Sequence, residues 1–396
     1  MYVDYRQAYD SIHRPALWNI LRYFKIPEKL IRVIRSLYNN SRGRVKVAGE
    51  LTEVFGVETG LRQGCPLSCV LFNLTLEWIL RHTPPSQDAV CMTNGVSCDR
   101  LGYADDLDLM GETYRGRDTQ MARFNQAGQK AGLQVSEEKT KVMKASREDR
   151  EEDFIVLDDF VLEMVDQFRY LGSTVTADND MVTEINIRIS SASKCTWGLN
   201  SILRSKSLSH TTKLCVYKTI IRPVLSYACE TWTTTKDTMM RLEVFERSVL
   251  RRIYGPVRDA ESGEWRIRHN YELLQMSQLP PISSFVRAQR LRWAGHVARM
   301  ADGSLLRLLL EGTPEGRRPL GRPRLRWEDC VKHDLALLGV DDPAGWMALA
   351  QDRQRWRQLV HTAKGHMGPA PMEYVRVSKS IRKGFIGGLI GISFTH

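Results

Sequence analysis

The spacing of the apolar residues changes once along the chain, and this change constrains the fold more than any other feature. Up to about residue 176, helix-length segments are interspersed with short runs in which apolar and polar residues alternate, as they do in strands. From Asp180 onward, apolar residues recur every three or four positions, which is the spacing of helices. The sequence therefore predicts a part of mixed helices and strands, followed by a helical part.

The first part reads as strands joined by helices. A hairpin is expected around Gly49, a second around a short acidic turn between Leu101 and Leu109, and Pro27 can start a second helix after the first one. Strands are expected at 2–5, 45–57, 101–109 and 168–175, and helices within 11–40, at 66–81 and at 124–131, the last closed by Gly132. This order predicts an α+β fold, with helices laid on one face of an antiparallel sheet.

The second part is helical and rich in arginine. Helices are expected over 180–202, 210–232 and 237–254. Residues 241–330 contain seventeen arginines and no lysine, against eleven acidic residues. The planar fork of arginine pairs bidentately with phosphate, although a solvated helical surface would also explain these residues. The stretch 316–327 favours nucleic-acid binding, because stiffening prolines separate its five arginines, Arg317, Arg318, Arg322, Arg324 and Arg326.

The composition narrows the class of protein. A formal net charge of +11 indicates an anionic partner, either nucleic acid or an anionic membrane surface. The late apolar run 385–394 is interrupted by glycines and is shorter than the ~20 residues of a membrane span, so no transmembrane helix is expected. Eight scattered cysteines without metal-ligand spacing, in a chain without a signal peptide, favour reduced thiols in an intracellular protein of the nucleus or cytoplasm.

Three carboxylates are candidates for chemistry. Asp4 ends the first expected strand, and Asp105 and Asp106 form the turn of the hairpin about a hundred residues later. Adjacent strands would bring these oxygen ligands together, and two divalent cations held there could clamp the attacking and leaving oxygens of a phosphoryl transfer. Asp-Asp is also common in turns for purely structural reasons, so the pair alone does not decide.

Five motifs carry a resemblance to a known family. In order, they are residues 2–11 (YVDYRQAYDS), 60–68 (GLRQGCPLS), 103–106 (YADD), 132–135 (GLQV) with Lys139-Thr140, and 168–173 (FRYLGS). Together they resemble the palm motifs of reverse transcriptases from non-LTR, LINE-type retrotransposons. The resemblance covers residues 1–176 and extends more loosely to 255. It implies a polymerase palm followed by a helical thumb.

The resemblance implies an RNA-directed DNA polymerase that extends a primer 3′-hydroxyl by two-metal nucleotidyl transfer. Its partners would be an RNA template, a DNA primer and deoxynucleoside triphosphates, and not a membrane. It further implies that Asp4 and Asp105 hold two Mg²⁺ ions, with Mn²⁺ as an alternative, and that Asp106 supports them. Lys139 would neutralise or protonate the leaving pyrophosphate, and a surface lysine is the competing interpretation.

Other roles are implied for residues around these carboxylates. Tyr9 would lie beneath the nucleotide sugar and clash with a 2′-hydroxyl, while Gln63 and Gly64 would flank the incoming nucleotide and its template base. The competing interpretations are a core aromatic residue and a turn glycine beside a solvent-facing glutamine. A primer grip is implied for Phe168, Tyr170, Leu171 and Gly172, which could equally be core strand residues.

We expect four regions: an incomplete palm at 1–176, a thumb at 177–255, an arginine-rich helical region at 256–363 and a weakly structured tail at 364–396. Members of the family carry a fingers subdomain and often an endonuclease upstream, so the chain is expected to be truncated at its N-terminus. Two other hypotheses remain: a catalytically inactive remnant that only binds RNA or DNA, and a maturase-type reverse transcriptase of mobile introns.

Overall fold

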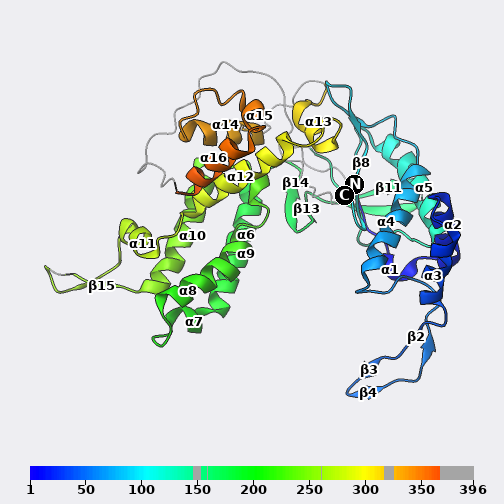
Figure 1. Ribbon diagram of the computed structural model, residues 1–396, viewed down its shortest axis with the longest axis horizontal. Helices are drawn as coiled ribbons and strands as arrows, with labels where there is room; N and C mark the ends of the chain where they lie inside the picture. Colours follow the sequence, from blue (N-terminus) through cyan, green and yellow to red (C-terminus); the bar gives the residue numbers. More distant parts are fainter. Residues whose placement is uncertain (146–152, 158, 260, 316–324, 366–396) are drawn as a thin grey trace. The chain divides into compact units, whose positions relative to one another are not determined.

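The chain divides into two compact units in the computed structural model (Figure 1). The structure describes residues 1–145, 153–157, 159–259, 261–315 and 325–365. Unit 1 comprises Met1–Cys91 and Gly95–Leu171, and unit 2 comprises Met92–Asn94 and the chain from Gly172 onward. The four regions expected from the sequence remain predictions.

Unit 1 mixes helices with short strands, as the sequence predicts. Its helices are α1 (Ala8–Ser11), α2 (Arg14–Tyr23), α3 (Glu28–Tyr38), α4 (Pro66–Arg81) and α5 (Tyr114–Ala131). Its strands are β1 (Tyr2–Val3), β2 (Arg42–Gly43), β3 (Lys46–Val47), β4 (Glu50–Leu51), β5 (Phe55–Gly56), β6 (Val90–Cys91), β7 (Ser97–Cys98), β8 (Arg100–Tyr103), β9 (Asp106–Leu109), β10 (Lys141–Val142), β11 (Phe154–Leu157), β12 (Phe160–Met164) and β13 (Gln167–Tyr170).

The main sheet has six strands in the order β11-β12-β10-β1-β9-β8. The expectation of an antiparallel sheet is correct for most neighbours but wrong for β10 and β12, which pair in parallel. The cause is a hairpin that the sequence reading missed: β11 and β12 pair antiparallel, and the hairpin lays its second strand beside β10. Strand β13, expected to end this sheet, is not one of its six members.

Helices α4 and α5 show how local sequence sets element ends. Helix α4 begins at Pro66, whose fixed φ suits the first helical position, and ends at Arg81 as predicted. Helix α5 begins ten residues before the predicted start, because the Thr113 side chain caps it by accepting from the Gly116 N–H. It ends at Gly132, which has φ 91° and so takes the left-handed conformation that glycine tolerates.

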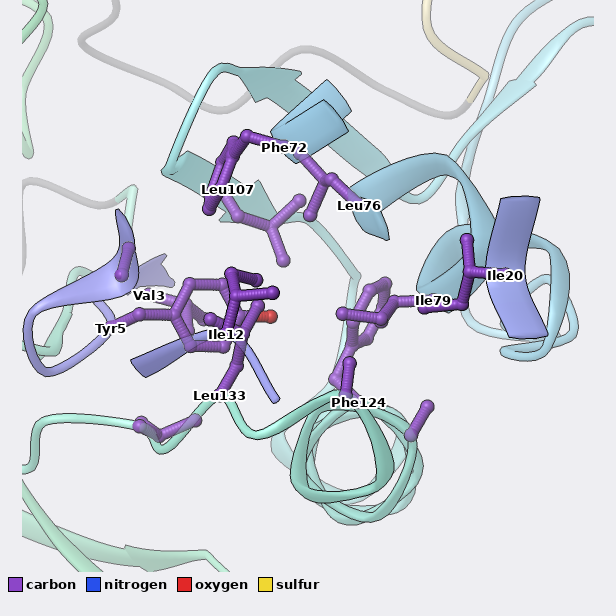
Figure 2. Packing of buried hydrophobic residues seen from close by; sticks show 14 of the residues in the cluster. Val3, Tyr5, Ile12, Ile20, Phe72, Leu76, Ile79, Leu107, Phe124 and Leu133 are labelled. Carbon is purple, nitrogen blue, oxygen red and sulfur yellow. The ribbon is translucent and has the colours of Figure 1, made fainter. Parts of the chain in front are cut away.

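The apolar core of unit 1 lies between the sheet and these helices. Figure 2 shows Val3 of β1 and Leu107 of β9 with Phe72 and Leu76 of α4 and Phe124 of α5 in this core. These five side chains are buried. Because successive strand residues face opposite sides, burial of Val3 and Leu107 turns the neighbouring strand-end positions away from this core. The carboxylates occupy those positions.

A two-part hairpin arm leaves the core of unit 1 between α3 and α4. Strands β2 and β5 pair at its base, and β3 and β4 pair at its tip, where Ala48 and Gly49 both have positive φ. The Gly49 hairpin is thus confirmed. Buried Arg14 fixes the base, because its guanidinium donates to the carbonyls of Val57, Thr59 and Gly60 at 2.7–3.0 Å.

Unit 2 is mostly helical, as the second part of the sequence predicts. Its helices are α6 (Met181–Gly198), α7 (Asn200–Arg204), α8 (His210–Val216), the π-helix η1 (Tyr217–Ile221), α9 (Arg222–Leu225), the 3₁₀ turn η2 (Cys229–Thr231), α10 (Lys236–Tyr254), α11 (Asn270–Ser277), α12 (Ile282–Ala298), α13 (Leu305–Glu311), α14 (Trp327–Leu337), α15 (Trp346–Leu349) and α16 (Arg353–Gly365). Its strands are β14 (Ser173–Thr176), β15 (Val257–Arg258) and β16 (Trp265–Arg266). No helix of the described residues is long and apolar enough to span a membrane.

Helix α12 takes part in two apolar cores of unit 2. Val286 belongs to the core formed with α6 and α10, whereas Ala288 and Leu291 belong to the core formed with α14 and α16. Gly295 lets α12 and α16 approach closely, because a Cβ there would lie 2.1 Å from the Trp356 indole nitrogen, which donates to the Leu291 carbonyl at 2.7 Å. The Arg-Trp-Ala-Gly-His segment at 292–296 therefore contains a packing contact.

Candidate active site

Asp4 directly follows β1, which lies between β9 and β10 in the main sheet. Its backbone N–H donates to Thr140 Oγ1 at 3.2 Å, and its carbonyl accepts from the Ser136 N–H at 2.8 Å. The motif at 132–135 continues this pairing, since Val135 forms a bridge with Tyr5. The backbone of Asp4 is therefore held on one flank by the segment that follows α5.

The acidic turn lies on the other flank of β1. Strands β8 and β9 form the predicted hairpin, with Tyr103 paired to Asp106, so that Ala104 and Asp105 make a two-residue turn. In the register of β1 with β9, Val3 pairs with Leu107. One step further along both antiparallel strands, Asp4 and Asp106 come opposite each other. The topology thus brings together the carboxylates predicted from the sequence.

The negative charges of these carboxylates influence the pKa of Asp106. The pKa of Asp106 is raised, first by partial burial of its carboxyl group and then by the negative charges of Asp105 and Asp4. The Lys139 ammonium lies 3.7 Å from Asp4 Oδ1, with its side chain 66% exposed. Among the described residues, no three His, Cys, Asp or Glu side chains are arranged closely enough to hold a metal ion. The carboxylates of Asp4, Asp105 and Asp106 are hard, negatively charged oxygen ligands, which suit a divalent cation. They do not form a complete coordination shell.

Tyr9 lies beside the acidic turn. Its ring stacks on Phe72 of α4, with centroids 4.5 Å apart and planes 12° apart. The pKa of Tyr9 is raised to about 12, first by burial, then by interaction with the Cys69 thiol and by the negative charge of Asp105. The structure thus supports both interpretations of Tyr9, a ring packed on the core and a ring near the carboxylates.

Gln63 and Gly64 precede α4 in an exposed loop. Gly64 has φ 81°, a conformation that favours glycine, and a Cβ there would have no atom within 4 Å. The Gln63 amide donates to both carboxylate oxygens of Asp10 at 3.2 Å each. Two residues later, Cys65 has a lowered pKa, chiefly because the Leu67 N–H hydrogen-bonds its sulfur. The glutamine is therefore not simply solvent-facing.

Strand β13 packs on β1 through aromatic rings. Phe168 stacks on Tyr2 with centroids 4.0 Å apart, and Tyr170 lies 5.6 Å from the same ring. The pKa of Tyr170 is raised, mainly by burial and then by the charges of Asp108 and Asp106. Leu171 and Gly172 both have positive φ in the turn that follows β13. Phe168 and Tyr170, two of the candidate primer-grip residues, thus lie beside β1, the strand that Asp4 follows.

The arginine-rich stretch is described only at its end. Arg317, Arg318, Arg322 and Arg324 lie outside the described residues. Arg326 directly precedes α14, and its backbone N–H donates to Asp329 Oδ2 at 2.9 Å. The adjacent Trp327 donates from its indole to the Glu230 carbonyl at 2.7 Å. At this end of the stretch, the sequence serves helix initiation and packing.

Two residues of the site were not predicted from the sequence. Asp10 contacts Gln63 across 53 positions, and the Cys69 thiol, 60 positions after Tyr9, contributes to the raised pKa of that tyrosine. The signal for Asp10 was its place beside Tyr9 in the first motif. Cys69 lies one helical turn after Cys65 on α4, and this spacing could have indicated that both thiols approach the same region.

Comparison with known families agrees with these motifs. Residues 1–175 match the family model described as "Reverse transcriptase (RNA-dependent DNA polymerase)". The matched range contains Asp4, Asp105, Asp106, Lys139 and strand β13.

Three curated relatives extend the comparison. A transposon-derived protein of Caenorhabditis elegans is 28% identical over 275 residues, covering 67% of this chain and 96% of that protein. The Pol polyprotein of the R2 retrotransposable element of Nasonia vitripennis is 27% identical over 47% of this chain, and the RNA-directed DNA polymerase from the X-element of Drosophila melanogaster is 24% identical over 68%. The chain spans only 19% and 29% of these two longer proteins. Over residues 1–175, the chain is therefore similar to the reverse transcriptases of retrotransposable elements.

Proposed function

We propose that the chain is an RNA-directed DNA polymerase that extends a primer 3′-hydroxyl on an RNA template. The observation that carries this proposal is the register of β1 and β9, which sets Asp4 opposite Asp106, the β9 residue that follows Asp105 of the turn. The pKa of Asp106 is raised mainly by burial, and the further contributions of the Asp105 and Asp4 charges support the proposal, because neighbouring carboxylates favour a bound cation.

Asp4 and Asp105 are proposed to hold two divalent ions, with Asp106 in support. The donor set fits Mg²⁺, a hard cation that prefers carboxylate oxygens, and Mn²⁺ takes the same ligands. Such ions would supply positive charge to the attacking and leaving oxygens of the transfer. Lys139, within ion-pair distance of Asp4, adds a further positive charge toward the leaving pyrophosphate.

The remaining site residues are proposed to position the substrates. Tyr9, packed on Phe72, would present its ring edge to the nucleotide sugar. Gln63 and Gly64 would contact the incoming nucleotide and its template base. The primer end would rest on the β13 segment and the following turn, through Phe168 and Tyr170, which pack on the strand before Asp4.

We propose that solvent-exposed arginines of the arginine-rich segment 241–330 contact backbone phosphates of the RNA template and DNA primer. The similarity to proteins of the R2 and X elements supports the proposal that the chain is a polymerase encoded by such an element. Binding of this kind depends on counterion release, so it should weaken steeply with salt and show little sequence preference.

The test is primer extension on an RNA template with deoxynucleoside triphosphates and Mg²⁺. The intact chain should make DNA, and Asp105→Asn/Asp106→Asn should lower the rate by at least about a thousandfold. Glu77→Gln is a matched control, because Glu77 forms an exposed ion pair with Arg81 on α4. Equal rates for the intact chain and the aspartate variant would refute the polymerase.

A second candidate is a nucleic-acid-binding protein without polymerase activity. It is favoured by the lack of a ready-made group of three metal-ligating side chains in the described part of the chain. Retained, salt-dependent RNA binding by an intact chain that makes no DNA would select this candidate.

A further inference from the structure

The loop before α4 is anchored to the segment that carries Tyr9. The Leu61 N–H donates to the Tyr9 carbonyl, and the Gly60 N–H donates to the Ile12 carbonyl, each at 2.8 Å. A Cβ at Gly60 would lie 2.6 Å from the Asp10 backbone, so only glycine permits this approach. These contacts fix Gln63 next to Asp10 although 53 positions separate them.

The contact between Asp10 and Gln63 fixes the orientation of the amide. Gln63 Nε2 lies 3.2 Å from both carboxylate oxygens of Asp10. An ionised carboxylate has no hydrogen to donate, so it can only face the NH₂ end of the amide. The carbonyl oxygen of this exposed side chain is then the end left for a ligand.

We propose that Asp10 is a positioning residue that holds the Gln63 carbonyl oxygen toward the incoming nucleotide. The site at Gln63 is then an acceptor, and it selects a donor group on the nucleotide, either a sugar hydroxyl or a base N–H. This inference rests on the proposed polymerase function. Without Asp10 the amide can rotate by half a turn and present its NH₂ group to the same donor, which leaves the hydrogen bond unmade.

The test is a mutant cycle in single-nucleotide incorporation. Asp10→Asn keeps the size of the side chain but supplies a carboxamide, which can donate as well as accept and so no longer fixes the amide. We expect KM for the nucleotide to rise about tenfold and kcat to change less than about twofold, since one substrate hydrogen bond is lost. Gln63→Leu should raise KM similarly, and Asp10→Asn should add nothing in the Gln63→Leu background.

Nucleotide analogues identify the donor. If the donor is the sugar 3′-hydroxyl, the effect of Asp10→Asn on KM should disappear with a dideoxynucleotide, and if it is a base N–H, the effect should persist. Either result supports an acceptor at Gln63. Glu77→Gln, which removes an exposed carboxylate from α4, should leave both constants unchanged.

Three results would overturn the role of Asp10. Additive effects of Asp10→Asn and Gln63→Leu on KM would show that Asp10 does not act through Gln63. A fall in kcat with constant KM would show that it does not position the nucleotide. The free energies of unfolding of the same variants can be measured without any activity. If the effects of Asp10→Asn and Gln63→Leu on the free energy of unfolding are additive, the two side chains do not interact. An intact chain that makes no DNA would instead refute the proposed function, and this role with it.

Discussion

Two buried carboxylates of unit 2 contrast with two exposed carboxylates of unit 1. In unit 2, Glu246 is buried and fully engaged: Tyr217 Oη and Arg222 donate to Oε1 at 2.6 and 2.7 Å, and the Ile282 N–H donates to Oε2 at 2.7 Å. Asp334 is likewise buried against Arg290, at 2.6 Å. In unit 1, Asp105 and Asp106 are exposed, and the pKa of Asp106 is raised, first by partial burial of its carboxyl group and then by the charge of Asp105. Carboxylates neutralised within the protein stabilise the fold, whereas the exposed pair is the proposed binding site for a cation.

The largest effect is expected from the proposed metal ligands. Asp4→Asn should lower primer extension by about a thousandfold or more, because it removes a proposed ligand of both metal ions. The free energy of unfolding should change by about 0.5 kcal/mol or less, as for most substitutions near the surface. Parallel measurement of extension rate and urea unfolding checks the contrast. A large loss of stability would place Asp4 with the structural carboxylates.

The buried set should behave in the opposite way. Glu246→Ala should cost about 3–5 kcal/mol, because it leaves the Arg222 guanidinium buried without its partner. The matched control is Glu243→Ala on the same helix, where the half-buried pair with Arg247 should contribute about 1 kcal/mol or less. Urea unfolding followed by tryptophan fluorescence measures both. Equal effects of the two substitutions would contradict the assignment of Glu246 as a structural carboxylate.

Substitution of Tyr9 distinguishes a role in sugar selection from a role in core packing. Tyr9→Ala should raise ribonucleotide incorporation relative to deoxyribonucleotide by about tenfold, if the ring excludes a 2′-hydroxyl at a cost near 1.4 kcal/mol. Tyr9→Phe retains the stacking on Phe72 and should keep the wild-type ratio. Single-nucleotide incorporation gives the ratio. An unchanged ratio in Tyr9→Ala would show that Tyr9 only packs in the core and does not select the sugar.

The smallest expected effect is that of Asp106→Asn on the free energy of unfolding. Because the folded-state pKa of Asp106 is raised, ionisation at neutral pH opposes folding, so Asp106→Asn should stabilise unit 1 by a few tenths of a kcal/mol after solvent screening. The gain should shrink as pH falls below about 4, where the carboxyl is protonated in the unfolded chain as well. Unfolding curves at pH 7 and pH 3.5 measure it. A loss of stability at pH 7 would mean that Asp106 is already compensated.

Local signals explain what was predictable in unit 1. Pro66 and the prolines after Arg81 fixed both ends of α4, and the alternation around Asp105 fixed the β8–β9 hairpin. The β11–β12 hairpin was missed although an acidic pair separates its two apolar runs, the same signal as at Asp105. Its parallel pairing with β10 depends on long-range topology.

Long-range contacts explain what was not predictable. Helical spacing places Glu246 on the apolar face of α10, but the groups that neutralise it, Arg222 and Ile282, lie elsewhere in the chain. Asp10 meets Gln63 only through backbone pairing across about fifty residues. The motifs thus located the site carboxylates, and the tertiary structure supplied their partners.

Mn²⁺ binding, measured by water-proton relaxation, tests the central contrast most directly. The intact chain should bind Mn²⁺, Asp105→Asn/Asp106→Asn should abolish most of that binding, and Asp334→Asn in the folded state should leave it unchanged, because the Asp334 carboxylate is paired with Arg290. Mn²⁺ binding that survives the loss of Asp105 and Asp106 would contradict the account.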